Sequence, residues 1–98
     1  MRILWLRRAE QDFSAICEYL LERDPAAALN TFEAIQEKVS VLADHPDIGR
    51  PGRVEDTREL VITQAPYIVA YTVDVRRDIL IILRVLHARQ RWPEDFDR

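Results

Sequence analysis

The second half of the chain carries most of the side chains that could bind an anion. Thirteen of the fourteen basic residues are arginine, and the single lysine is Lys38. A guanidinium is always charged and matches a phosphate or a carboxylate with two parallel hydrogen bonds. Residues 1–49 hold five basic and nine acidic side chains, a balance of −4, whereas residues 50–91 hold eight and five, a balance of +3. The arginines of residues 50–91 are therefore candidates for contact with phosphate or acidic groups, and ordinary surface ion pairing is the alternative.

Other kinds of site chemistry are poorly represented. Cys17, His45 and His87 are the only cysteine and histidines, and their wide separation along the chain excludes the ligand spacing of a metal site. Both serines, Ser14 and Ser40, fall inside predicted helices, away from the strained turn that a serine nucleophile needs. No glycine-rich phosphate loop is present. We expect no metal and no cofactor, and we expect Cys17 to be a buried, unreactive thiol.

Two amphipathic helices precede these arginines. Residues 3–6 are a short apolar run that predicts a buried strand. From Ala9 onward, apolar residues recur at steps of three and four, which predicts a helix that continues to about residue 22. Asp24 and Pro25 then predict the start of a second helix, with the carboxylate as its N-cap and proline in its first position. So short a connection predicts an antiparallel helical hairpin.

The remaining residues predict a loop and an antiparallel sheet. Two glycines and two prolines within residues 45–53 predict a loop without regular structure, in which the glycines have positive φ or approach another group closely. The runs at 58–63, 67–74 and 79–88 predict three strands that pair in sequence as a meander. The last run is apolar on both faces, but the hairpin can cover only one. The other face is therefore predicted to be partly exposed and to bind a protein partner, with coverage by the tail as the alternative.

These elements form one α+β domain over residues 1–98, with residues 89–98 as a C-terminal tail. The predicted core combines one face of the 79–87 strand with apolar residues of both helices: Phe13, Ile16, Leu20, Phe32, Ile35 and Val39. If Phe32 is fully buried, its truncation to alanine should cost roughly 3–5 kcal/mol of folding free energy. No apolar run reaches the ~20 residues of a membrane-spanning helix, and the N-terminus does not read as a signal peptide. A cytoplasmic location without membrane contact is expected.

Three segments together resemble the RelE/ParE superfamily of toxins from type II toxin–antitoxin systems. They read GRPGRVEDTRELV at 49–61, APYIVAY at 65–71 and ILRVLHARQRWP at 82–93. The N-terminal residues 9–13, Tyr19 and the helix start at 25–27 match the same family. The resemblance implies a strand, two antiparallel helices and an antiparallel sheet, which agrees with the elements predicted above. It also implies a hetero-oligomer with a cognate antitoxin of the ParD or RelB type.

The superfamily divides by target, and the resemblance leaves two activities open. RelE-like members cut mRNA in the ribosomal A site, which needs assistance to the attacking 2′-oxygen and cations on the phosphate. Arg53, Arg58, Arg84 and His87 could supply these groups, with Trp92 stacked on a base. The lysines used by RelE-like enzymes are missing, however. Strand alternation also places Arg84 and His87 on opposite faces unless a bulge intervenes.

ParE-like members instead inhibit DNA gyrase, and the low total charge and missing lysines favour this activity slightly. For either target, the predicted contact residues lie in the loop and the tail: Arg50, Arg89, Arg91 and Trp92. The antitoxin is predicted to cover apolar surface that includes Leu80 and Ile82, and to pair its acidic residues with Arg50, Arg53 and Arg58. A non-toxic interaction module that has kept the fold is the third possibility.

Overall fold

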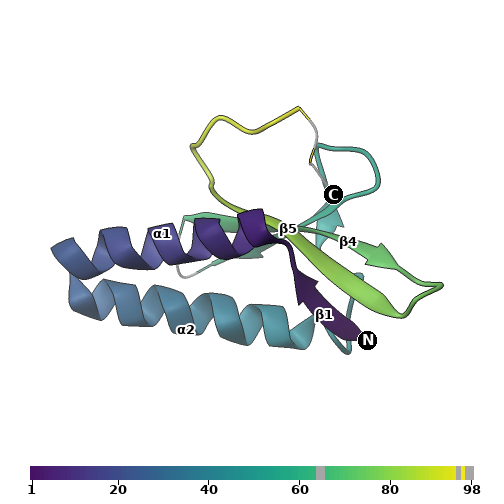
Figure 1. Ribbon diagram of the computed structural model, residues 1–98, viewed down its shortest axis with the longest axis horizontal. Helices are drawn as coiled ribbons and strands as arrows, with labels where there is room; N and C mark the ends of the chain where they lie inside the picture. Colours follow the sequence, from purple (N-terminus) through teal and green to yellow (C-terminus); the bar gives the residue numbers. More distant parts are fainter. Residues whose placement is uncertain (64–65, 95, 97–98) are drawn as a thin grey trace.

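The structure is a computed structural model that describes residues 1–63, 66–94 and 96. Within these residues, β1 (Arg2–Trp5) leads into two helices, α1 (Arg7–Arg23) and α2 (Pro25–Val41). Four strands follow: β2 (Arg50–Pro51), β3 (Arg58–Ile62), β4 (Tyr67–Asp74) and β5 (Ile79–His87). The helices pack on one face of the sheet, and their hairpin projects beyond the end of the strands (Figure 1).

The strands form a single mixed sheet in the order β1-β5-β4-β3-β2. Strands β3, β4 and β5 pair antiparallel, which confirms the predicted meander. Strand β1 adds to β5 in parallel, with Trp5 opposite Ile82. The prediction that β1 is buried is wrong. Strand β1 lies at the edge of the sheet, with β5 on one side only, and its residues are half-buried or exposed. The predicted loop at 45–53 also contains β2, which pairs with the start of β3.

The predicted start of the second helix is confirmed. The Asp24 carboxylate accepts a hydrogen bond of 3.1 Å from the Ala27 backbone N–H, and Pro25 occupies the first helical position. The cap matters because the first amide groups of a helix lack partners within the helix. The backbone N–H of Asp24 also donates to the Leu20 carbonyl, so this one residue both ends α1 and starts α2. The hairpin is therefore as tight as its sequence predicts.

The glycines of the loop allow close approach rather than an unusual backbone. Neither glycine has a positive φ, so of the two predicted roles only close approach to another group applies. Among the described residues, Asp56 and Asp78 have a positive φ. A side chain at Gly49 would lie 2.5 Å from the hydroxyl oxygen of Tyr71. That hydroxyl accepts a hydrogen bond from the Gly49 N–H and donates one to the Pro46 carbonyl. Burial raises the pKa of Tyr71, so the phenol remains a donor.

The core lies between the helical hairpin and the sheet. Phe13, Ile35 and Val39 are buried there, and Ile16 packs against their cluster while remaining partly exposed. Phe32 departs from the prediction because it lies beside the buried stripe of α2 and remains 43% exposed. Its ring stacks on Phe13 at a centroid distance of 5.4 Å, and Phe13 stacks on Trp5 in turn. Phe32 therefore ends an aromatic row instead of filling the core.

Replacing Phe32 with alanine is accordingly expected to cost less than the value predicted for a fully buried site. Half of the side-chain burial and one stacked pair correspond to about 1–2 kcal/mol. Urea denaturation of the variant measures this loss. Phe13→Ala is the matched control, since Phe13 is only 9% exposed and should lose about 3–5 kcal/mol. Equal losses for the two variants would contradict the placement of Phe32.

The sheet is covered on both faces, which corrects the prediction of an exposed apolar face. Ile68, Ala70, Leu83 and Leu86 are each at most 4% exposed. The tail after β5 and the loop between β2 and β3 arch over the side away from the helices (Figure 1). The chain thus supplies its own second layer, which was the alternative that the sequence left open.

The predicted antitoxin contacts at Leu80 and Ile82 are corrected by the same packing. Both side chains have no exposed surface, because they face the helices and belong to the main core cluster. Neither can contribute to a binding surface in this conformation.

In the described part of the chain, no helix is long and apolar enough to cross a membrane.

Candidate functional site

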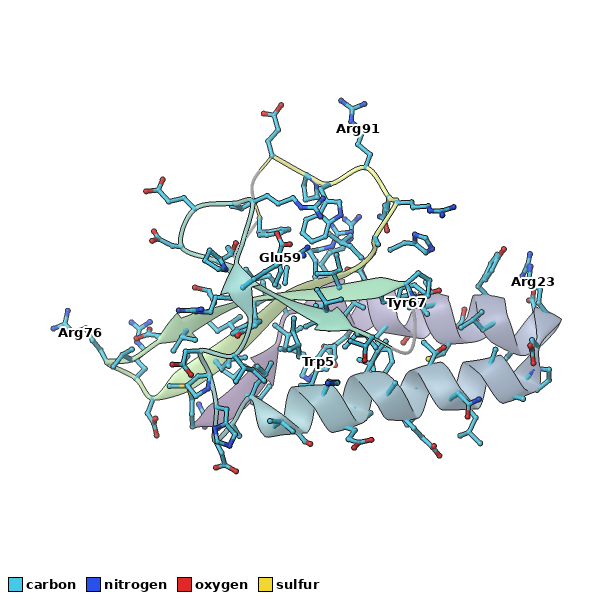
Figure 2. All side chains as sticks on the ribbon, turned by 180° about the vertical axis from the view of Figure 1, so that it is seen from behind. Trp5, Arg23, Glu59, Tyr67, Arg76 and Arg91 are labelled. Carbon is cyan, nitrogen blue, oxygen red and sulfur yellow. The ribbon has the colours of Figure 1, made fainter. Side chains whose placement is uncertain are left out.

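A buried carboxylate organises the loop that carries the first candidate arginines. Glu59 projects from β3 on the side of the sheet away from the helices (Figure 2) and is only 3% exposed. Its Oε1 accepts hydrogen bonds from Arg50 Nε and Nη2, at 3.2 and 2.9 Å. Its Oε2 accepts a bond of 2.8 Å from the backbone N–H of Arg53 and lies 3.5 Å from Arg53 Nε. Glu59 therefore neutralises part of this basic loop and holds its backbone in place.

The C-terminal tail is attached to the same cluster through an aromatic ring. The Arg53 guanidinium carbon lies 3.8 Å from the ring centroid of Trp92, a cation–π contact. The indole Nε1 of Trp92 is buried and has no hydrogen-bond partner among the described residues. One face of the Trp92 ring is thus already occupied by Arg53, which leaves less of the ring for stacking on a nucleobase. We name Arg50, Arg53, Glu59 and Trp92 the Glu59 cluster.

Arg58 lies outside the Glu59 cluster. It alternates with Glu59 along β3, on the same face as Leu60 and Ile62, which belong to the core under the helices. Its Nη1 donates to the backbone carbonyls of Asp47 and Gly49, at 3.2 and 2.7 Å. A guanidinium that satisfies loop carbonyls has a clear structural role. Arg58 therefore fastens the 46–49 loop to the sheet.

Arg84 forms an ion pair with a residue 72 positions earlier in the chain. Its Nε and Nη2 donate to the two carboxylate oxygens of Asp12 on α1, at 2.7 and 3.1 Å. The Asp12 carboxylate also accepts a hydrogen bond of 3.0 Å from the Val85 N–H. Both side chains are close to nine-tenths buried. This two-point contact joins α1 to β5 where β5 extends past the end of β1.

His87 ends β5 and is held by its neighbours in the tail. Its backbone N–H donates to Gln90 Oε1, and its ring Nδ1 accepts from the Arg89 N–H at 3.0 Å. The imidazole meets the ring of Tyr67 edge-on, with centroids 5.5 Å apart. Burial raises the pKa of the Tyr67 phenol, and the nearby Tyr19 and Cys17 raise it further. Because His87 Nδ1 accepts the hydrogen bond from the Arg89 N–H, a neutral His87 ring carries its proton on Nε2.

The predicted catalytic residues do not converge on one point. The register of β4 and β5 shifts between Ile82 and Arg84, so the bulge lies before both Arg84 and His87. Arg84 pairs with Ala70, whereas His87 pairs with Tyr67, whose side chain packs in the core under the helices. The two side chains consequently remain on opposite faces, as strand alternation predicts.

The predicted target contacts fall into two groups. Arg89 and Arg91 are exposed on the tail, and none of the ion pairs in the described part of the chain involves them. Arg50 is half-exposed despite its bond to Glu59, and Trp92 lies under Arg53. Figure 2 shows Arg91 at the outer side of the tail, above Glu59. Among the predicted target contacts, Arg89 and Arg91 on the tail are therefore the charged groups most available to a partner.

The sequence prediction does not include the two carboxylates that organise the site. Asp12 occupies the polar face of an amphipathic helix, and Glu59 lies on the sheet face that the sequence predicts to be partly exposed. The acid at position 59 is the one detectable signal, because a carboxylate inside an apolar strand flanked by arginines favours an internal ion pair. Asp12 carries no comparable local signal.

Sequence comparisons place the chain among small toxins. The family model described as the ParE toxin of the type II toxin–antitoxin system parDE matches residues 3–92. A putative toxin, Y4kP, from Sinorhizobium fredii is 43% identical over 93 residues, which cover 95% of this chain and 94% of that protein. Toxin RelE3 from Caulobacter vibrioides is 30% identical over 86% of this chain and 90% of its own length.

Solved structures agree with this relationship. A chain from the chromosomal ParDE toxin–antitoxin system of P. aeruginosa superposes with a TM-score of 0.78 and 28% identity, over 89% of this chain and 95% of that one. The isolated E. coli RelE toxin superposes with a TM-score of 0.69 over 92% of this chain and 86% of its own. At 13% identity, the second likeness concerns the fold alone.

Proposed function

Because this chain belongs to the ParE toxin family of type II toxin–antitoxin systems, we propose that it arrests growth by inhibiting DNA gyrase. Its partner is an antitoxin that neutralises it. The gyrase target is the more specific part of the proposal, and it concerns what the toxin does once the antitoxin has been removed.

The engagement of the candidate catalytic arginines supports this target. Metal-free RNA cleavage needs cations that are free to stabilise charge on the phosphate as it develops. Here Arg84 is bound by Asp12, Arg53 is held at Glu59, and Arg58 donates to loop carbonyls. A nuclease would have to break these internal contacts before it could use the same guanidinium groups. The only lysine, Lys38, lies on α2 and offers no substitute.

A histidine variant separates the two activities. If the target is gyrase, His87→Ala should leave inhibition of supercoiling unchanged, because a binding inhibitor needs no proton transfer. The measurement is supercoiling of relaxed plasmid by purified gyrase, titrated with purified toxin in the absence of ribosomes. If the toxin is instead a nuclease, removing one general acid–base group should slow A-site cleavage roughly 10²–10⁴-fold.

The folded state of the variant needs its own control. His87 bonds to Arg89 and contacts Tyr67, so its removal could affect folding. The far-ultraviolet circular dichroism and the melting temperature of the His87→Ala protein are therefore compared with those of the parent chain. Arg76→Ala, on the β4–β5 turn at the far end of the molecule (Figure 2), provides a charge-removing control away from the tail. Supercoiling that stays active at saturating toxin would overturn the gyrase proposal.

A RelE-like activity remains the second candidate on one observation, which is that relatives named RelE2 and RelE3 match 89% and 86% of the chain. Under that alternative, Arg53 and Arg84 would approach the phosphate from the same face of the sheet. Ribosome-dependent cleavage of an mRNA by the purified toxin, with supercoiling unaffected, is the result that would establish it.

A further inference from the structure

A groove lies between α1 and the ends of β4 and β5, where β5 runs into the tail. Its volume is about 440 Å³. Ala15, Ile16 and Tyr19 of α1 form one wall, and Tyr67, Val85 and His87 at the ends of β4 and β5 form the other. This groove is separate from the Glu59 cluster, which lies on the opposite side of the sheet.

The backbone of β5 beside the groove is already hydrogen-bonded. Strand β1 pairs with β5 only as far as Ile82, so the following residues of β5 form a free edge. Side chains satisfy that edge: the Val85 N–H donates to Asp12, and the His87 N–H donates to Gln90. The His87 carbonyl accepts from the Gln90 N–H. An added β-strand would therefore displace existing bonds, so the groove is better suited to receive side chains.

The polar groups of the groove are mainly hydrogen-bond donors. Asp12 is the one carboxylate in the described lining, and its oxygens are occupied by Arg84 and Val85. The Tyr67 phenol stays protonated because its pKa is raised, and no described residue bonds to its hydroxyl. Gln90 uses its Oε1 as an acceptor and keeps its NH₂ group as a donor. A ligand of this groove must supply acceptors.

Positive charge lies along one rim of the groove. Arg89 and Arg91 are exposed on the tail directly after His87, and Gln90 between them lines the groove. Neither arginine forms an ion pair within the described residues. The lining between the two walls' polar groups is apolar, since Ala15, Ile16 and Val85 contribute to it. The combination fits an apolar side chain flanked by carboxylates.

We propose that this groove binds an acidic, amphipathic segment of the antitoxin. An apolar side chain of that segment packs against Ala15 and Ile16, and a neighbouring carboxylate accepts a hydrogen bond from Tyr67. Further acidic residues pair with Arg89 and Arg91, instead of with the internally bonded Arg53 and Arg58. The inference rests on the family membership, which supplies an antitoxin, and is independent of the gyrase target.

A pair of adjacent substitutions on α1 tests the groove directly. Ala15 is exposed and lines the groove, whereas its exposed neighbour Ser14 does not. Ala15→Arg should weaken binding of the purified cognate antitoxin at least about 100-fold, because the long side chain fills the groove. Ser14→Arg adds the same charge and bulk one residue away and should leave the dissociation constant within about threefold of the parent value. Titration calorimetry measures both.

Two milder variants test the polar half of the proposal and do not depend on blocking the groove. Tyr67→Phe removes only a hydroxyl and should weaken antitoxin binding about tenfold, the value of one hydrogen bond to a charged acceptor. Arg89→Gln should also weaken binding, and the loss should shrink as salt is raised. Arg76→Gln, at the other end of the molecule (Figure 2), is the matched control and should bind like the parent chain.

The alternative occupants give distinct results. Equal affinity of Ala15→Arg and Ser14→Arg for the antitoxin would overturn the proposal. So would light scattering in which Ala15→Arg dissociates a toxin dimer while antitoxin binding is unchanged, since the occupant would then be a second copy of this chain. Loss of gyrase inhibition by Ala15→Arg with unchanged antitoxin affinity would assign the groove to the target instead. A toxin that does not inhibit gyrase, but whose variants bind antitoxin as stated, refutes the proposed target and leaves this inference intact.

Discussion

Asp12→Ala is expected to destabilise the protein by about 3–5 kcal/mol, because it leaves the Arg84 guanidinium buried without a counter-charge. The Asp12 carboxylate binds both Arg84 nitrogens and the Val85 N–H, so its removal also leaves an amide at the edge of β5 unsatisfied. About nine-tenths of each side chain is buried, so water can replace little of what is lost. Urea denaturation at neutral pH measures the change in unfolding free energy.

Two further variants separate the ion pair from general effects on α1. Glu18→Ala removes an exposed acid of the same helix and should change stability by less than about 0.5 kcal/mol. Arg84→Met in the Asp12→Ala background removes the uncompensated charge and should recover part of the loss. A loss below about 1 kcal/mol for Asp12→Ala would show that the pair is not buried as described. Arg84 would then be free to act on a phosphate.

Glu59→Ala is expected to cost about 2–3 kcal/mol and to loosen the C-terminal tail. The expected loss is smaller than that for Asp12 because the two arginines that Glu59 binds are about half-exposed and can be rehydrated. Without Glu59, the Arg53 backbone N–H and both guanidinium groups lose their acceptor. The stack of Arg53 on Trp92 should then open, because nothing else in the Glu59 cluster holds Arg53 in place.

The loosening of the tail can be measured separately from stability. In a Trp5→Phe background, Trp92 is the remaining tryptophan, and its fluorescence should shift to the red in Glu59→Ala as water reaches the ring. Trypsin should also cut faster after Arg89 and Arg91. Glu55 is exposed in the same loop and forms no ion pair in the described structure, so Glu55→Ala should change neither signal. An unaltered Trp92 spectrum in Glu59→Ala would mean that the tail is held by other contacts.

The predicted catalytic arginines have structural roles in the fold. The sequence predicts Arg53, Arg58 and Arg84 as possible catalytic groups because a guanidinium suits a phosphate. Each one has an internal acceptor, namely Glu59, two loop carbonyls and Asp12. The arginines Arg89 and Arg91, predicted as target contacts, have no such partner among the described residues. Their roles stay predictions, and the tail is where charge is available for either the target or the antitoxin.

The sequence alone determined the features that depend on neighbours in the chain. The Asp24-Pro25 pair marks the start of α2 because capping involves residues within one helical turn. The helical hairpin and the β3–β4–β5 meander follow from apolar periodicity and short connections, which are also local properties. The segments at 49–61, 65–71 and 82–93 carry the family resemblance, because the order and spacing of short motifs can be read directly from the sequence.

The tertiary structure alone decided which faces are covered and which charges meet. Phe32 has the same periodicity as its buried neighbours, yet its exposure depends on where α1 crosses α2. The second face of the sheet is buried because the tail folds back over it, a long-range choice that periodicity cannot express. Asp12 and Arg84 are 72 residues apart, and only the docking of α1 beside the free edge of β5 brings them within hydrogen-bond distance. Local sequence sets the periods of helices and strands, whereas burial and ion pairing depend on contacts between elements, so they are settled only when those elements pack.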